Sequence, residues 1–216
     1  LMMYHREAGL LDQELREMDR CMPCYCHMTN NHGQGADLVM RAEAALLRGQ
    51  FTDAEIELER AYAAIEGNGQ ENIALCCDFL ALRLYLMGQG RPRCTPQDRR
   101  AILKGQHNIV WLNMWDGCCA YFYAVLGRPE RIPESFAGHD LDAMNFLAPG
   151  RPMMDMVENQ VLLAQGEWAK VIGRSEKLLK KCRSFHYGLV SLYVRIQTAA
   201  AYAMLDKQAE AIRLLY

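Results

Sequence analysis

Neither sign of charge dominates this chain, and no long apolar run occurs in it. Its 216 residues include 24 lysines and arginines against 26 aspartates and glutamates, which gives a net charge of −2. A surface that binds nucleic acid needs an excess of cations, so this balance argues against direct contact with DNA or RNA. No apolar run reaches the ~18 residues of a membrane span, and the first residues lack the apolar core of a secretion signal. We therefore expect no membrane contact.

A disulfide framework is not expected either. The chain has nine cysteines, an odd number, and two adjacent pairs stand at Cys76–Cys77 and Cys118–Cys119. Because the chain shows no secretion signal, this cysteine usage favours reduced thiols and a cytoplasmic protein.

Motifs of catalysis are missing from the sequence. No G-x-x-x-x-G-K-[ST] loop occurs, and the six histidines stand at no fixed spacing from a nucleophile or a carboxylate. The glycine-rich stretch Asn31–Gly35 precedes a helix, where an anion could bind, but it follows no strand and has no P-loop lysine. We interpret this stretch as a turn between repeats, and we expect neither an enzyme nor a cofactor.

What the chain does contain is a ladder of glycines. Gly49, Gly88, Gly127 and Gly166 recur with a constant period of 39, and Asp206 continues the series after an interval of 40. Gly9 precedes Gly49 by the same interval of 40. A period of about 20–50 residues is typical of solenoids built from repeated units. Stacked helix pairs usually bind partners and seldom carry chemistry of their own.

Two columns of residues follow this ladder. The position seven residues before each ladder residue is alanine in all but one repeat: Ala42, Ala81, Ala120, Asn159 and Ala199. The position two residues before is apolar in every repeat: Leu47, Leu86, Val125, Ala164 and Met204. Small residues let neighbouring helices approach closely, and a chance ladder would not carry both columns, so we interpret the repeat as real.

Helical periodicity and helix-end signals divide the chain into helix pairs. The predicted helices are 36–48, 52–65, 73–87, a helix starting at 96, 107–126, 135–137, 153–165, 168–182, 189–205 and 209–216. Thr52 with Glu55 forms a predicted capping box, and Thr95 is predicted to cap a helix that starts at Pro96. No segment shows strand alternation. We predict one all-α domain over 1–216, with repeats at 1–30, 36–66, 72–104, 107–138, 152–183 and 188–216.

Parts of this pattern resemble known helical repeats. The set Ala42, Gly49, Phe51, Ala54 and Ala61 resembles a tetratricopeptide repeat, and so does Gly166-Glu167-Trp168 with Leu178. The period of 39 is longer than the ~34 of that repeat and is similar to the helical-repeat region of MalT-like regulators of the LuxR family. The stretches 31–49, 127–133 and 149–168 strengthen this likeness, which covers nearly the whole chain.

The resemblance implies a right-handed α-α superhelix of about five helix pairs. It also implies a parent protein with a nucleotide-binding switch domain before the repeats and a LuxR-type helix-turn-helix after them. We expect this chain to be a fragment that holds only the middle part. Its expected partners are a small-molecule inducer or a protein or peptide, together with the other domains of the parent.

Candidate ligand residues follow from the analogy with tetratricopeptide repeats, in which the first helix of each pair lines the concave face. The inward positions lie three, six and ten residues before each ladder glycine, with one equivalent place thirteen before Asp206. Their polar and aromatic members are Glu43, Asp78, Tyr85, Tyr121, Gln160 and Tyr193. Such a mixture suits a small polar metabolite or a peptide. The alternatives are that several of these residues pack between repeats, and that the chain is a generic adaptor without a transcriptional role.

One cysteine cluster admits a zinc interpretation. Cys21, Cys24 and Cys26 stand close to His27 and His32, and these are the residue types that ligate zinc. No second C-x-x-C completes a structural site, so we favour cysteines in a helix end and a loop, and we expect no metal.

Three further clusters are interpreted structurally. Five aromatics could stack on a sugar or a base, but core packing of a long helix is favoured for them: Trp111, Trp115, Tyr121, Phe122 and Tyr123. Five cations are interpreted as a solvated helix face in preference to a phosphate site: Arg91, Arg93, Arg99, Arg100 and Lys104. Glu176-Lys177 with Lys180-Lys181 is interpreted as exposed surface with i,i+4 ion pairs.

Overall fold

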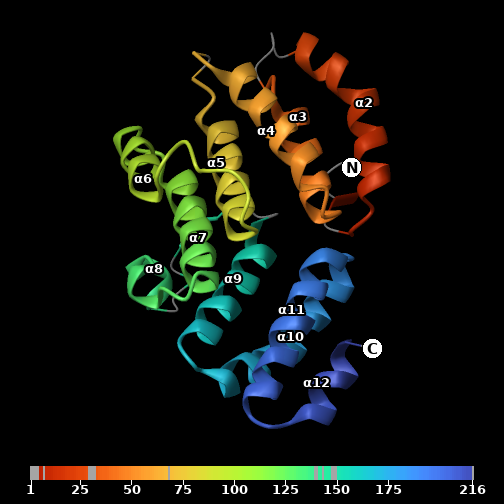
Figure 1. The fold of residues 1–216 in the computed structure, drawn as a ribbon, viewed down its shortest axis with the longest axis vertical. Helices are drawn as coiled ribbons and strands as arrows, with labels where there is room; N and C mark the ends of the chain where they lie inside the picture. Colours follow the sequence, from red (N-terminus) through yellow and green to blue (C-terminus); the bar gives the residue numbers. More distant parts are fainter. Residues whose placement is uncertain are drawn as a thin grey trace. The chain divides into compact units, whose positions relative to one another are not determined.

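The computed structural model describes residues 5–6, 8–28, 33–67, 69–138, 141–142, 144–146 and 150–215. Within these ranges the chain forms α-helices and one short 3-10 helix, with no strand (Figure 1). The prediction of an all-α fold is therefore confirmed. None of the helices in the described ranges has the length and apolar character needed to cross a membrane.

The chain divides into two compact units, one with Leu10–His107 and the other with Asn108–Tyr216 and Arg6–Gly9. The helices of the first unit are α2 (Leu11–Met28), α3 (Ala36–Leu47), α4 (Phe51–Ile65), α5 (Glu71–Leu86) and α6 (Pro96–Gly105). Helix α3 packs against α2, α4 and α5, and α4 also packs against α5 (Figure 1). The core of this unit includes fully buried small residues, Ala42, Ala54, Ala61 and Cys77, which let α3, α4 and α5 approach closely.

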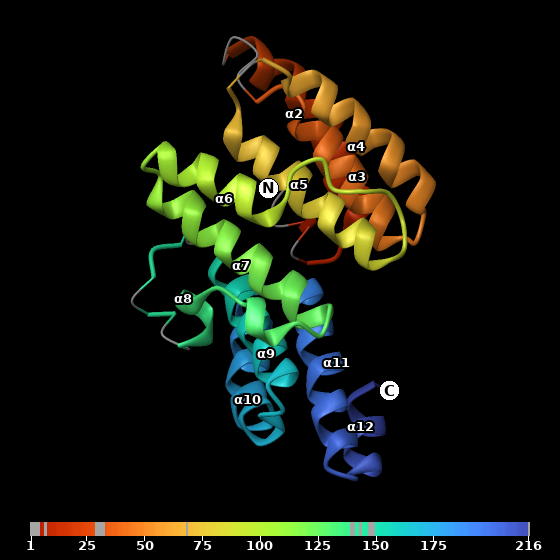
Figure 2. The ribbon, with the colours of Figure 1, turned by 60° about the vertical axis from the view of Figure 1, so that its left-hand side comes forward.

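The second unit repeats this arrangement at its C-terminal end. Its helices are α7 (Ile109–Val125), η1 (Pro129–Arg131), α8 (Glu134–Ala137), α9 (Arg151–Ala164), α10 (Trp168–Phe185), α11 (Gly188–Met204) and α12 (Gln208–Leu215). Helices α9, α10 and α11 pack against one another, and α12 packs against α11 (Figure 2). The shared core of α9, α10 and α11 contains one residue from each helix: Leu162, Val171 and Ala201.

The ladder residues all occupy one kind of turn. Gly49, Gly88, Gly127 and Gly166 have φ values of 75°, 78°, 69° and 77°, and Asp206 has a φ of 57°. In each case the amide of the following residue donates to a carbonyl five residues earlier, as Gln50 does to Ala45 at 2.9 Å. The ladder residue itself donates to a carbonyl three residues earlier. This pair of hydrogen bonds is the Schellman motif, which requires the left-handed conformation that glycine adopts most easily.

The two columns differ in their burial. All five residues seven positions before the ladder are buried, as expected where helices approach closely. The column two positions before the ladder lies at the helix ends and is half-buried to exposed. The alanine column is therefore a packing column, and the apolar column covers the edges of the helix pairs.

The predicted helix ends lie within three residues of those in the structure, and one predicted cap is wrong. Thr95 Oγ1 accepts a hydrogen bond from the Asp98 amide at 3.1 Å, and Pro96 is the first residue of α6, as predicted. The capping box at Thr52 is wrong, because α4 already begins at Phe51 and Gln50 stands at its cap position without a side-chain cap. The Schellman turn at Gly49 leads directly into the helix, so Thr52 lies inside the first turn.

One helix pair has a much reduced second helix. After α7, Pro129 and Pro133 interrupt the chain, and α8 is only four residues long. Phe136 of α8 is fully buried, and α8 packs against α7 and α9. Gly117 of α7 makes room for this packing, because a Cβ there would lie 3.1 Å from Phe136 Cζ and 2.4 Å from Met154 Sδ. Where α4 and α10 are long second helices, this pair has the short 3-10 helix η1 and the four residues of α8.

Candidate functional site

The candidate residues of the first unit differ in accessibility. Tyr85 is 46% exposed and presents its side chain to solvent. Glu43 forms an ion pair with Arg83 of α5, Nη1 to Oε1 at 2.8 Å, and both side chains are largely covered. Glu43 therefore links α3 to α5, while Tyr85 retains surface that a partner can contact.

Asp78 is buried in a polar network and is not accessible to a ligand. It is 1% exposed; Tyr62 Oη donates to its Oδ1 at 2.7 Å and Arg99 Nε donates to its Oδ2 at 2.5 Å. Arg99 also pairs with Glu71. Burial raises the pKa of Asp78 above its ordinary value, against the opposing effect of Arg99. The carboxylate thus holds α4, α5 and α6 together.

This network also corrects the interpretation of the basic patch. Arg99 is buried on α6 and so does not belong to a solvated helix face. Arg93 pairs with Glu59 of α4, and its guanidinium lies 4.5 Å from the centre of the Tyr62 ring. A cation over a tyrosine face is attracted by the ring quadrupole, so Arg93 has a second contact to α4.

The candidate residues of the second unit are half-buried. Tyr121 lies on α7 and Tyr193 on α11. Gln160 of α9 accepts a hydrogen bond through Oε1 from Gln197 Nε2 at 3.0 Å, and the same nitrogen donates to the Met156 carbonyl at 3.1 Å. Gln160 is thereby held against α11, which matches the alternative that some inward residues pack between repeats.

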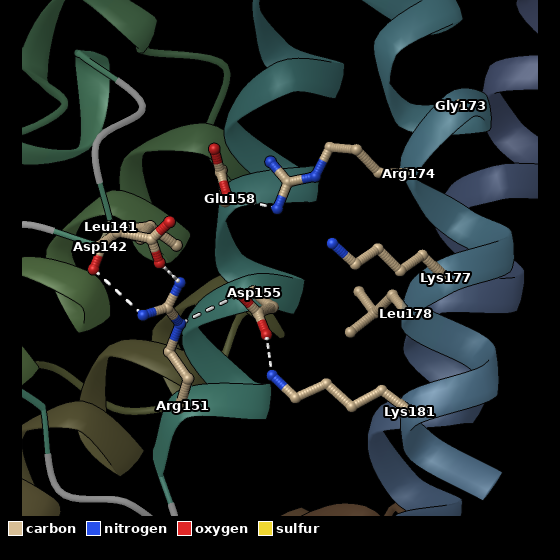
Figure 3. A pocket seen from close by; sticks show the side chains of 10 residues that line it. All are labelled: Leu141, Asp142, Arg151, Asp155, Glu158, Gly173, Arg174, Lys177, Leu178 and Lys181. Carbon is tan, nitrogen blue, oxygen red and sulfur yellow. Dashed lines mark hydrogen bonds and ion pairs between the residues drawn. The ribbon is translucent and has the colours of Figure 1, made fainter.

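A charged pocket lies between α9 and α10, and none of the six candidate residues lines it (Figure 3). Its volume is about 650 Å³. Ten residues line it: Leu141, Asp142, Arg151, Asp155, Glu158, Gly173, Arg174, Lys177, Leu178 and Lys181. Seven of these ten are charged, so the pocket is built for a polar occupant.

Helical spacing explains how the charges reach the pocket. Arg151, Asp155 and Glu158 are four and three residues apart on α9, so they share one face of that helix. Arg174, Lys177 and Lys181 are three and four residues apart on α10 and share a face in the same way. Figure 3 shows the side chains of the two helices pointing toward each other across the pocket.

The ion pairs across the pocket involve all but one of the cations in its wall. Lys181 Nζ lies 2.9 Å from Asp155 Oδ2, and Arg174 pairs with Glu158. Arg151 bridges Asp155 at 3.2 Å and Asp142 at 2.7 Å, and the Arg151 guanidinium holds the pKa of the Asp142 carboxyl below its usual value. Within the described ranges Lys177 has no ion-pair partner, and its side chain points into the pocket between Arg174 and Lys181 (Figure 3).

None of the residues predicted to bind a ligand lies in this pocket. The pattern of residues 176–181 predicts exposed surface with pairs along one helix, whereas Lys181 pairs across to Asp155 of α9. Two signals in the sequence point toward the pocket when taken together. One is the cationic stripe Arg174, Lys177 and Lys181, and the other is the short second helix before α9 with its irregular segment.

The other two clusters of the sequence analysis give clear outcomes. Trp115, Phe122 and Tyr123 are buried, so the core interpretation of these aromatics is confirmed. Cys21, Cys24, Cys26 and His27 lie on α2, and among the described residues no cluster of three or more His, Cys, Asp or Glu is placed to hold a metal ion. His32 lies outside the described residues.

Comparison with known proteins gives no relative: no family model matches the chain, and no curated protein and no solved structure is similar to it.

Proposed function

We propose that this chain is the sensor and scaffold domain of a MalT-like regulator of the LuxR family, with its helix pairs stacked as an α-α superhelix. The observation that carries the proposal is the recurrence of one Schellman turn with a period of 39 or 40, each turn followed by a second helix. The buried alanine column in register with these turns supports it as well. Repeats of this kind bind partners on an extended surface.

The inward positions provide the binding residues of this proposal. Tyr85 is exposed, and Tyr121, Gln160 and Tyr193 are half-buried, so these four retain surface for an inducer or a protein partner. Aromatic faces with a polar group suit a small polar metabolite or a peptide. Asp78 is left out of the binding set, because its carboxylate is enclosed by Tyr62 and Arg99.

The mechanism of the proposal is a population shift. An inducer or partner that binds one arrangement of the repeats more tightly than another moves the protein toward that arrangement. The altered arrangement then changes how the switch domain of the parent docks on the repeats.

The parent protein provides the test. We expect a P-loop domain encoded before this segment and a helix-turn-helix after it, and we expect Tyr85→Ala with Tyr121→Ala to alter promoter output in a reporter assay. Tyr25→Ala serves as control, because Tyr25 is an exposed tyrosine outside the inward positions. Circular dichroism establishes that each variant folds.

A generic adaptor is the alternative function. It predicts that the flanking sequence encodes neither domain and that the tyrosine variants lose binding to a protein or peptide partner. Unchanged promoter output together with flanks lacking both domains would refute the regulator and leave the adaptor.

A further inference from the structure

We propose that the pocket between α9 and α10 binds the phosphate group of a small molecule through Lys177, Arg174 and Lys181. This site is independent of the inward tyrosines and goes beyond the function proposed above. The described residues of the pocket wall carry four cations and three carboxylates, an excess of one positive charge.

Lys177 is the cation of the wall that forms no ion pair with a described residue, and its charge acts on Asp142 from a longer distance. Each carboxylate of the wall has a cationic partner: Arg151 for Asp142, Lys181 for Asp155 and Arg174 for Glu158. An ammonium group that points into a pocket and forms no ion pair attracts an anion more strongly than one that extends into bulk water. The structure thus presents a positive group at the place where a ligand would enter.

The neighbours of Lys177 add donors to the same place. Arg174 meets Glu158 through Nη2, and its guanidinium carries five N–H donors. Lys181 carries three donors and uses one on Asp155. The three side chains share one face of α10, and the ammonium group of Lys177 lies between the Arg174 guanidinium and the Lys181 ammonium (Figure 3). An anion bound to Lys177 therefore has further donors on both sides.

A phosphate group fits this arrangement better than a carboxylate does. Phosphate monoesters carry a charge of about −1.5 to −2 at neutral pH and offer three strong acceptor oxygens, which match several converging donors. A ligand carboxylate offers only two oxygens. The carboxylates of Glu158 and Asp155 in the pocket wall already pair with Arg174 and Lys181.

The size of the pocket and the charge of the chain limit the rest of the ligand. A volume of about 650 Å³ lies within the range of small-molecule sites. The net charge of −2 disfavours a long polyanion such as a nucleic acid. The occupant is therefore a small phosphorylated molecule.

Isothermal titration of the 216-residue chain with glycerol 3-phosphate tests the site, with inorganic phosphate, glycerol and succinate as comparison probes. We expect glycerol 3-phosphate to bind with a Kd below about 1 mM, and we expect the affinity to fall as sodium chloride is added. Binding of inorganic phosphate alone would identify the ligand as the free ion, and glycerol is expected not to bind.

Matched variants locate the binding. Lys177→Ala is expected to weaken binding of glycerol 3-phosphate at least about tenfold, while Lys177→Arg keeps the charge and most of the affinity. Lys180→Ala removes the same charge from an exposed position of α10 outside the pocket wall, and it should leave the affinity unchanged. Circular dichroism verifies the fold of each variant.

Several results would overturn the proposal. Absence of heat with both phosphate probes at concentrations well above about 1 mM would do so. Equal losses in Lys177→Ala and Lys180→Ala would show non-specific attraction, and succinate binding as tightly as glycerol 3-phosphate would replace phosphate by carboxylate chemistry. The promoter test of the tyrosines does not involve this pocket, so either proposal can fail while the other stands.

Discussion

Two carboxylates in equivalent helices have opposite surroundings. Asp78 in α5 is 1% exposed, and both of its oxygens accept from Tyr62 and Arg99. Asp155 in α9 lines an open pocket and meets Arg151 and Lys181, which are about a third exposed. The first carboxylate is enclosed by neighbouring helices, and the second is 13% exposed and lines a pocket.

The neighbouring helices differ around the two carboxylates. Asp78 receives Tyr62 from α4, the helix before α5, and Arg99 from the first turn of α6, the helix after it. Before α9 the second helix is the single turn of α8, followed by the segment that includes Leu141 and Asp142. The long helix α4 thus supplies a partner to the carboxylate of α5, whereas the wall beside Asp155 includes residues of the segment after α8.

The largest expected effect concerns two adjacent cysteines of α5, because their reactivities test whether water reaches the interior of the first unit. Burial raises the pKa of the Cys77 thiol from 9.0 to about 12, while Cys76 beside it is exposed. At pH 8 we expect iodoacetamide to label Cys76 about a thousandfold faster than Cys77, as measured by peptide mass spectrometry. Comparable rates would show that water reaches the interior of α5.

The raised pKa of Cys77 also makes the free energy of unfolding depend on pH. The folded pKa lies above the unfolded value, so the contribution of Cys77 is complete below about pH 9 and is lost as the pH rises toward 12. The free energy of unfolding should fall across that interval, and Cys77→Ala should reduce the slope.

The second test removes each carboxylate. Asp78→Ala leaves the buried Arg99 with Glu71 alone, and we expect a loss of about 3 kcal/mol in urea unfolding. Asp155→Ala is the matched change in the open pocket, where partly exposed partners limit the loss to under about 1 kcal/mol. Equal losses would contradict the distinction between sealed and open carboxylates.

The third test concerns a polar residue in the alanine column. Asn159 is 0% exposed, and neither its Oδ1 nor its Nδ2 has a hydrogen-bond partner among the described residues. We expect Asn159→Ala to raise the free energy of unfolding by about 1.5 kcal/mol, since an unsatisfied buried amide is costly. Ala42→Asn places the same group at the equivalent position of the first unit and should destabilise by a similar amount. A higher free energy of unfolding in Ala42→Asn would contradict the assignment of this position as a packing column.

The smallest test compares two threonines near helix starts. Thr95→Ala removes the hydroxyl that accepts from the Asp98 amide, and the expected cost is about 1 kcal/mol. Thr52→Ala lies inside the first turn of α4, where no side-chain cap exists, so thermal unfolding should change little. A larger loss of stability in Thr52→Ala than in Thr95→Ala would support the predicted capping box at Thr52.

The helices and their turns were predictable because their signals are local. A Schellman turn needs a left-handed residue and the carbonyls of the preceding turn, and glycine at Gly49 or Gly166 provides the first of these. The partners of Asp78 and of Lys181 were not predictable, because they come from other helices. Spacing along one helix shows which residues share a face, and it does not show what that face meets.

The helix pair of α7 and α8 also shows what the sequence could and could not predict. The short helix predicted at 135–137 is confirmed by α8, which follows Pro129 and Pro133. They gave no information on the pocket, which depends on Arg151 and Asp155 facing Arg174, Lys177 and Lys181. The column analysis followed the first helices of the pairs, whereas most of the pocket's cations lie on a second helix.

The Schellman turn also bears on how such a chain changes length. Each turn closes with hydrogen bonds between its own backbone groups and takes nothing from outside its few residues. The intervals before Gly49 and after Gly166 are one longer than those between the other ladder positions, yet the same hydrogen bonds recur at every turn. A tandem duplication cut at one turn and joined at another therefore restores an intact junction, and the array can grow or shrink by whole helix pairs.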